Sequence, residues 1–194
     1  WSGSVTYDNQ ARKFRKPDAS FGYVREQVEP LNKAKELVIE QSSDKYSVSW
    51  GAVYAQYQLP ASEVESHREG MTIRREVSSP LKGEVGRGSV HVRYTITSDR
   101  DYEYVCLRAP RPAAAEPARQ LSGYHWQNGL GYYQAMHDAS TDYYMDSLLR
   151  GTYVIEEDWL LARQGDSLLP PARLTCLYAP EFQAQTAGEK VGVK

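Results

Sequence analysis

A run near the middle of the chain reads Val90-His91-Val92-Arg93-Tyr94-Thr95-Ile96-Thr97. Apolar and polar side chains alternate along this run, and successive side chains of a β-strand point to opposite faces of the sheet. Val90, Val92, Tyr94 and Ile96 therefore share one face. The run predicts a β-strand whose apolar face is buried in a core.

Similar strand-like segments lie on both sides of this run, at residues 48–54, 152–155 and 174–178. Glycine and proline punctuate the chain between them, which is typical of short strands joined by turns. The pattern predicts an all-β fold: an antiparallel β-sandwich with a smaller β-rich segment at its N-terminal end.

Three segments break this pattern. Residues 30–40 contain good helix formers, although residues 37–39 look equally like the start of a strand, and residues 138–149 could hold a helical turn or two. Residues 110–120 carry three prolines, which are typical of an irregular crossover between strands.

The composition argues against several classes of protein. The 194 residues carry a net charge of −2 and no lysine- or arginine-rich run, which argues against nucleic-acid binding. No signal peptide or apolar run of membrane-spanning length is visible. Because the chain begins at Trp1 within a strand-like segment, we interpret it as an excised fragment whose targeting signal lies upstream.

Aromatic residues supply the candidate functional surface. The chain has 15 Tyr and 4 Trp against 3 Phe, and Tyr and Trp combine an apolar ring with a polar atom that suits interfaces. Tyr124, Trp126, Tyr132 and Tyr133 lie in a glycine-interrupted block that continues to Tyr143-Tyr144. We predict that these four residues contact a neighbouring domain. Packing inside the sandwich, and a sugar-binding or foreign-protein surface, are the alternatives.

The sequence shows no catalytic machinery and no metal site. The acidic triplet at residues 156–158 cannot by itself supply two facing carboxylates, because neighbouring strand residues point to opposite faces, and we interpret it as a solvated strand end. No Gly-x-Ser-x-Gly turn is present. We predict a protein that is not an enzyme and needs no metal or cofactor. The four histidines lack the ligand spacing of a zinc site: His67, His91, His125 and His137.

The two cysteines, Cys106 and Cys176, each lie in a strand-like run. They permit one disulfide without demanding it, since a free cysteine in a strand behaves as a small core residue. The sequence favours two unpaired core thiols and leaves the disulfide open.

The motifs from residue 81 onward, taken in order, resemble the terminal macroglobulin-like domain, MG10, of bacterial alpha-2-macroglobulin-like proteins. The matching segments are residues 83–92, 99–105, 122–133 and 151–153 and the closing phrase Tyr178-Ala179-Pro180-Glu181-Phe182. Residues 50–57 resemble the closing strand of that family's CUB-like domain. The resemblance divides the chain into a partial CUB-like segment (1–60), a linker (61–80) and an MG10 β-sandwich domain (81–194).

This resemblance implies a non-catalytic C-terminal region of a protease-trapping protein, with a macroglobulin-like or immunoglobulin-like sandwich fold. It implies a periplasmic or lipoprotein-anchored setting. The partners would be other domains of the same parent chain, and target proteases and the membrane would be reached only through that parent. The family's thioester phrase, Cys-x-Glu-Gln, is absent after both Cys106 and Cys176. The alternative function is a carbohydrate-binding β-sandwich module with exposed Tyr and Trp.

Overall fold

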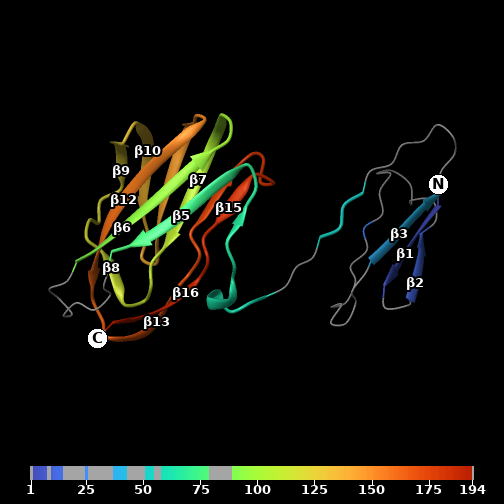
Figure 1. Ribbon diagram of the computed structural model, residues 1–194, viewed down its shortest axis with the longest axis horizontal. Helices are drawn as coiled ribbons and strands as arrows, with labels where there is room; N and C mark the ends of the chain where they lie inside the picture. Colours follow the sequence, from blue (N-terminus) through green and yellow to red (C-terminus); the bar gives the residue numbers. More distant parts are fainter. Residues whose placement is uncertain are drawn as a thin grey trace. The chain divides into compact units, whose positions relative to one another are not determined.

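The computed structural model describes residues 2–7, 10–14, 25, 37–42, 51–54, 58–78 and 89–193. The chain divides into two compact units, Trp1–Gln56 and Tyr57–Lys194, and each is described by itself (Figure 1). Strands dominate the described residues, which otherwise contain a short 3-10 turn, η2 (Ala61–Glu63), and no α-helix. None of the helical structure within these ranges has the length and hydropathy needed to cross a bilayer.

The N-terminal unit contains a three-stranded antiparallel sheet. Its central strand, β1 (Ser2–Tyr7), pairs with β2 (Gln10–Phe14) on one side and with β3 (Leu37–Ser42) on the other. The sheet confirms a smaller β-rich segment at this end of the chain. For residues 37–39 the sequence left helix and strand open, and the strand is the one found, where β-branched Val38 and Ile39 favour it. Residues 51–54 belong to no strand, and the rest of the predicted strand at 48–54 lies outside the described residues.

The C-terminal unit is an antiparallel β-sandwich, which confirms the predicted fold class (Figure 1). One sheet has seven strands in the order β4-β15-β14-β7-β11-β10-β9, and the other has four in the order β5-β6-β12-β8. The strands of the first sheet are β4 (His67–Arg68), β15 (Gln183–Gln185), β14 (Arg173–Cys176), β7 (Tyr102–Pro110), β11 (Ser140–Leu148), β10 (Leu130–Met136) and β9 (Gly123–Gln127). Those of the second are β5 (Met71–Val77), β6 (Ser89–Ser98), β12 (Gly151–Leu161) and β8 (Ala115–Pro117).

The core lies between the two sheets. On β6, Val90, Val92, Tyr94 and Ile96 are all buried, as their alternation predicts, and they face apolar side chains of the seven-stranded sheet. The largest fully buried side chain is Trp159 of β12. Fully burying one such side chain stabilises a fold by about 1.5–3 kcal/mol, so this inward row is a main source of stability.

The segment predicted as helical at residues 138–149 is instead the strand β11. Tyr143 and Met145 are buried while Tyr144 and Asp146 are exposed, so the side chains follow the period of two and not that of a helix. The crossover predicted at residues 110–120 is mostly irregular, but three of its residues form β8 on the sheet edge, where Pro117 needs no ladder donor.

The sandwich begins before residue 81. Residues 61–80, predicted as a linker, include β4 and β5, and β5 pairs with β6 from Met71↔Ser98 to Val77↔Val92. The side chain of Met71 is buried in the core. This stretch is polar in sequence because half of β5 faces solvent. For that reason the sequence does not indicate β5 as a strand, although it forms one edge of the four-stranded sheet.

A two-stranded antiparallel sheet, β13 (Gly165–Leu169) with β16 (Glu189–Val193), lies at the C-terminal end of the unit (Figure 1). Arg75 of β5 holds it in place. The buried Arg75 guanidinium donates hydrogen bonds to the carbonyl oxygens of Pro170 (2.6 Å) and Ala187 (3.1 Å) and lies 3.4 Å from Glu189 Oε1. A buried arginine is stabilised by such charge-assisted hydrogen bonds.

Candidate functional site

A row of tyrosines crosses the outer face of the seven-stranded sheet. Tyr124 of β9 is the register partner of Tyr133 of β10, which in turn is the partner of Tyr144 of β11. The Tyr124 and Tyr133 rings meet edge to face, with centroids 5.0 Å apart and planes at 71°. Because register partners lie on the same face of a sheet, three neighbouring strands bring these rings together.

Trp126 extends this row into a larger aromatic surface. Its six-membered ring lies against Gly131 of β10, where a Cβ atom would come within 3.0 Å of the ring. The side chains of Tyr124 and Trp126 are 82% and 76% exposed, and those of Tyr133 and Tyr144 are 37% and 38% exposed. We call Tyr124, Trp126, Tyr133 and Tyr144 the aromatic face.

The turn of the β9–β10 hairpin holds the aromatic face in place. Asn128 and Gly129 both have positive φ, 50° and 80°, as a type I′ turn requires. The Asn128 side chain donates to the carbonyl of Val154 on β12 (3.0 Å), and Gln127 Oε1 accepts from the backbone N–H of Glu156 (3.0 Å). These bonds tie the hairpin to the other sheet, so the backbone that carries the exposed rings is held in place.

Tyr132, the fourth residue predicted for the contact surface, faces the interior. It is 6% exposed, its ring meets Tyr143 edge to face at 5.4 Å, and it stacks against His125 at 5.8 Å. Burial raises the pKa of Tyr132, and its hydroxyl donates to Gln127 Oε1 (3.2 Å). Tyr132 and Tyr133 are consecutive on one strand, so only one of them can reach the outer face.

Two further exposed tyrosines come from distant parts of the sequence. Tyr104 of β7 and Tyr178, just after β14, meet edge to face with centroids 5.2 Å apart. Tyr178 is 81% exposed, and Tyr104 has a φ of 54°, which is uncommon for a residue with a side chain. The sequence analysis missed this pair because residues 104 and 178 come together only through the β7–β14 pairing.

A groove of about 610 Å³ is lined by the aromatic face and by residues around the β9–β10 hairpin. Gly131 of β10 and the acidic residue Asp146 of β11 are among the residues that line it. The other lining residues are mostly aromatic or apolar: Tyr124, His125, Trp126, Gly129, Leu130, Tyr132, Tyr133, Tyr144, Ser147, Leu149 and Tyr153. A groove of this size and character is in the range of protein ligand sites.

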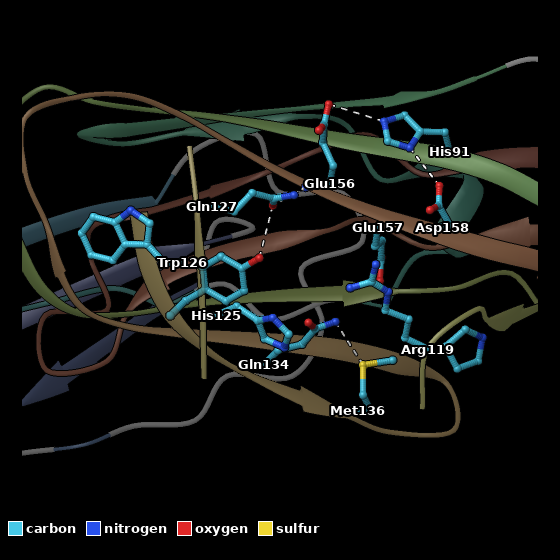
Figure 2. Close-up of a pocket in the computed structure, with 12 residues that line it drawn as sticks. His91, Arg119, His125, Trp126, Gln127, Gln134, Met136, Glu156, Glu157 and Asp158 are labelled. Carbon is cyan, nitrogen blue, oxygen red and sulfur yellow. Dashed lines mark hydrogen bonds and ion pairs between the residues drawn. The ribbon is translucent and has the colours of Figure 1, made fainter. Parts of the chain in front are cut away.

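A second, more polar cleft of about 300 Å³ lies beside the same hairpin (Figure 2). His91 stands at its rim between two carboxylates, with Nδ1 2.9 Å from Asp158 Oδ1 and Nε2 3.4 Å from Glu156 Oε1. The hydrogen bond to Asp158 raises the pKa of His91. The Arg93 side chain, 2.8 Å from Glu156, lowers the pKa of that carboxyl group. These charged groups neutralise one another and leave no free acid–base pair.

Glu157 lies deeper in this cleft, on the inward face of β12. Burial raises its pKa, while hydrogen bonding opposes that shift. The hydroxyls of Tyr94 (3.2 Å) and Thr141 (2.9 Å) donate to its carboxylate. The interpretation of residues 156–158 as a solvated strand end is therefore wrong for Glu157, because β12 continues to Leu161 and alternation turns this carboxyl group inward.

The two cysteines are free thiols, which confirms the favoured interpretation. Thr175 is the register partner of Cys106, so Cys176 is one residue out of register and points to the opposite face. Burial raises the pKa of Cys106 to about 11. In the part of the chain that the structure describes, no group of three or more His, Cys, Asp or Glu side chains is placed to hold a metal ion.

Comparison with protein families identifies one match, the bacterial alpha-2-macroglobulin MG10 domain, over residues 67–181. Among curated protein sequences no match was found. Residues 67–181 make up more than half of the 194-residue chain.

Several solved structures share the fold. Salmonella alpha-2-macroglobulin reacted with methylamine is 16% identical, with a TM-score of 0.59 over 70% of this chain and 10% of that one. Native Escherichia coli alpha-2-macroglobulin, spanning domain MG7 to the C-terminus, is 12% identical, with a TM-score of 0.58 over 70% and 25% of the two chains. The Escherichia coli protein activated by porcine elastase is 12% identical, with a TM-score of 0.60 over 100% and 18%. The present chain thus spans a quarter or less of each of these proteins.

Proposed function

Because the chain belongs to the bacterial alpha-2-macroglobulin family, we propose that it is a non-catalytic C-terminal region that packs against other domains of its parent protein. The observation that carries this proposal is the aromatic face. Tyr124 and Trp126 are more than three-quarters exposed on a rigid hairpin. Contiguous exposed apolar patches of this kind mark interaction surfaces, because leaving them in water forgoes hydrophobic stabilisation.

The geometry of the aromatic face suits contact with a folded partner. Tyr and Trp are enriched at the centres of protein interfaces, where they bring large contact areas at a low cost in conformational entropy. The hydrogen bonds of Asn128 and Gln127 to β12 fix the hairpin before any partner arrives. Such preorganisation reduces the entropy lost on association.

The polar cleft supports a non-catalytic role. A general acid or base needs a proton that it can exchange with a substrate. In this cleft the His91 imidazole is held between Asp158 and Glu156, and Glu156 is also paired with Arg93. The Glu157 carboxylate accepts hydrogen bonds from the hydroxyls of Tyr94 and Thr141. The arrangement resembles a structural ion network that joins β6 to β12.

For the whole protein we propose protease trapping, with this region acting as a brace between domains. Among the relatives, the Escherichia coli protein is described as activated by elastase. Residues 1–60 would form part of a CUB-like domain, with the MG10 domain following it. The parent would lie in the periplasm or be anchored to the cell envelope as a lipoprotein, and target proteases would meet the parent and not this region.

Limited proteolysis of the full-length parent tests the proposal. Substituting alanine for both Tyr124 and Trp126 is expected to loosen the domain contact and to make the linkers around the MG10 domain more sensitive to cleavage. Unchanged cleavage rates at these linkers, relative to the unsubstituted parent, would contradict a contact through the aromatic face.

The alternative of a carbohydrate-binding module receives less support from the ring geometry. A sugar platform needs two or three coplanar rings open to solvent. The Tyr124–Tyr133 and Tyr104–Tyr178 pairs meet at 71° and 84°, so neither forms a flat platform. A glycan array with the isolated chain checks this alternative, and we expect no specific binding.

A further inference from the structure

The Trp126 ring fills the space above Gly131, which lines the groove over the aromatic face. Because Gly131 has no side chain, the indole extends from β9 over β10. Asp146 lines the same groove from β11. Strands β9 and β11 are separated by two interstrand spacings, about 10 Å, and the indole narrows that gap. The Trp126 ring and Asp146 therefore line the same groove.

The charged residue among those that line this groove is an acid. Asp146 is its single carboxylate, and no lysine or arginine lies among the described residues that line it. Asp146 is exposed, and none of the hydrogen bonds or ion pairs among the described residues involves it. The neighbouring rings of Tyr124, Tyr133 and Tyr144 present further π-systems. Aromatic side chains around an acidic group favour a cation, which the ring quadrupoles and the carboxylate both attract.

We infer that this groove receives an arginine side chain carried by a neighbouring domain of the parent protein; the inference rests on the proposed interdomain role of the aromatic face. Arginine fits better than lysine for two reasons. Its planar guanidinium stacks on aromatic rings, and it is less strongly hydrated than an ammonium group. The guanidinium would lie between the Trp126 ring and the Asp146 carboxylate, while the apolar stem would pack along the tyrosines.

An NMR titration of the 194-residue chain tests the inference directly. The probe is Nα-acetyl-arginine amide, and its neutral counterpart is Nα-acetyl-citrulline amide, which has nearly the same shape without the charge. The readout is the indole N–H signal of Trp126, identified by its loss in Trp126→Phe. Saturable shifts are expected with the arginine compound, with a dissociation constant about tenfold lower than that of the citrulline compound.

Two variants test whether the Asp146 carboxylate is the source of the preference for the arginine compound. Asp146→Asn removes the carboxylate of the groove and is expected to weaken arginine binding about fivefold to tenfold. Glu116→Gln removes an exposed carboxylate of β8 in the other sheet and is expected to leave the binding unchanged. Equal binding of the two compounds, or unchanged arginine binding in Asp146→Asn, would overturn the inference.

This outcome is separable from that of the proposed function. Protection of the aromatic face in the parent, combined with no arginine preference in the titration, would retain the domain contact and reject arginine as the occupant. Exposure of the face in the parent would reject the contact, and the arginine in it, whatever the titration shows.

Discussion

The double substitution Tyr124→Ala and Trp126→Ala should destabilise the isolated chain only slightly and the full-length parent more, if these two residues form a contact between domains. In the isolated chain these side chains are 82% and 76% exposed. Their removal costs only the edge-to-face contact with Tyr133 and the contact of the indole with Gly131. We expect the free energy of unfolding to fall by about 1 kcal/mol or less.

In the full-length parent the same substitutions should cost more. A partner that covers both rings removes on the order of 300 Å² of aromatic surface from water, with an upper bound of about 7 kcal/mol. Truncations of central interface residues typically cost 2–4 kcal/mol each and do not add. We therefore expect the parent to lose about 2–4 kcal/mol of domain-packing free energy.

Differential scanning calorimetry of the chain and of the parent measures both effects. The melting temperature of the isolated chain should shift by about 4 °C or less, and the transition containing the MG10 domain in the parent should shift by about 5–15 °C. Leu160→Ala, on the outer face of the four-stranded sheet, is the matched control and should give small shifts in both. Equal shifts of the double variant in chain and parent would refute the reasoning.

Three further predictions concern the core and the ionisable groups. Tyr94→Phe removes a donor to the Glu157 carboxylate and should destabilise the chain by about 1.5–3 kcal/mol in urea unfolding. The raised pKa of His91 means that its protonated form stabilises the fold: this contribution is complete below the unfolded pKa of about 6.5 and is lost as the pH rises through the folded pKa. The wild type should therefore lose more stability than His91→Gln between pH 6 and pH 9, and parallel curves would contradict the ion network. With a pKa of about 11, Cys106 should react with iodoacetamide at a rate that rises about tenfold per pH unit up to that value, and a plateau near pH 8.5 would count against its burial.

The strands of the sandwich could be predicted wherever one face is apolar and the other polar. Val90, Val92, Tyr94 and Ile96 follow this rule and are buried as expected. The rule gives no warning about β5, because its apolar residues are interspersed with the charged run at residues 74–76. Arg75 shows the difficulty: it resembles a solvated arginine in sequence, yet its buried guanidinium donates to the carbonyls of Pro170 and Ala187, next to β13 and β16.

The sequence indicates the aromatic block but not which of its side chains face outward. Alternation requires Tyr132 and Tyr133 to point in opposite directions, but the sequence alone does not say which one points inward. The register of β10 with its neighbours decides this, since Tyr133 pairs with Tyr124 and Tyr144. Pairing register depends on long-range contacts, which no local pattern in the sequence reports.

The inward orientation of the Glu157 carboxyl group could not be predicted from the sequence, for a different reason. A charged residue in a strand is normally exposed, because burying an unpaired charge is costly. Here the hydroxyls of Tyr94 and Thr141 offset that cost, and they come from β6 and β11. Only the packing of the two sheets brings these groups together.

Hydroxyl-radical footprinting of Tyr124 and Trp126 tests the central claim most directly, because it compares the accessibility of the same two side chains in the isolated chain and in the full-length parent. Both should be readily oxidised in the chain, where they are more than three-quarters exposed, and strongly protected in the parent. Exposed Tyr54 serves as an internal reference for the dose in the isolated chain. Equal oxidation of Tyr124 and Trp126 in both proteins would contradict the assignment of the aromatic face to domain packing.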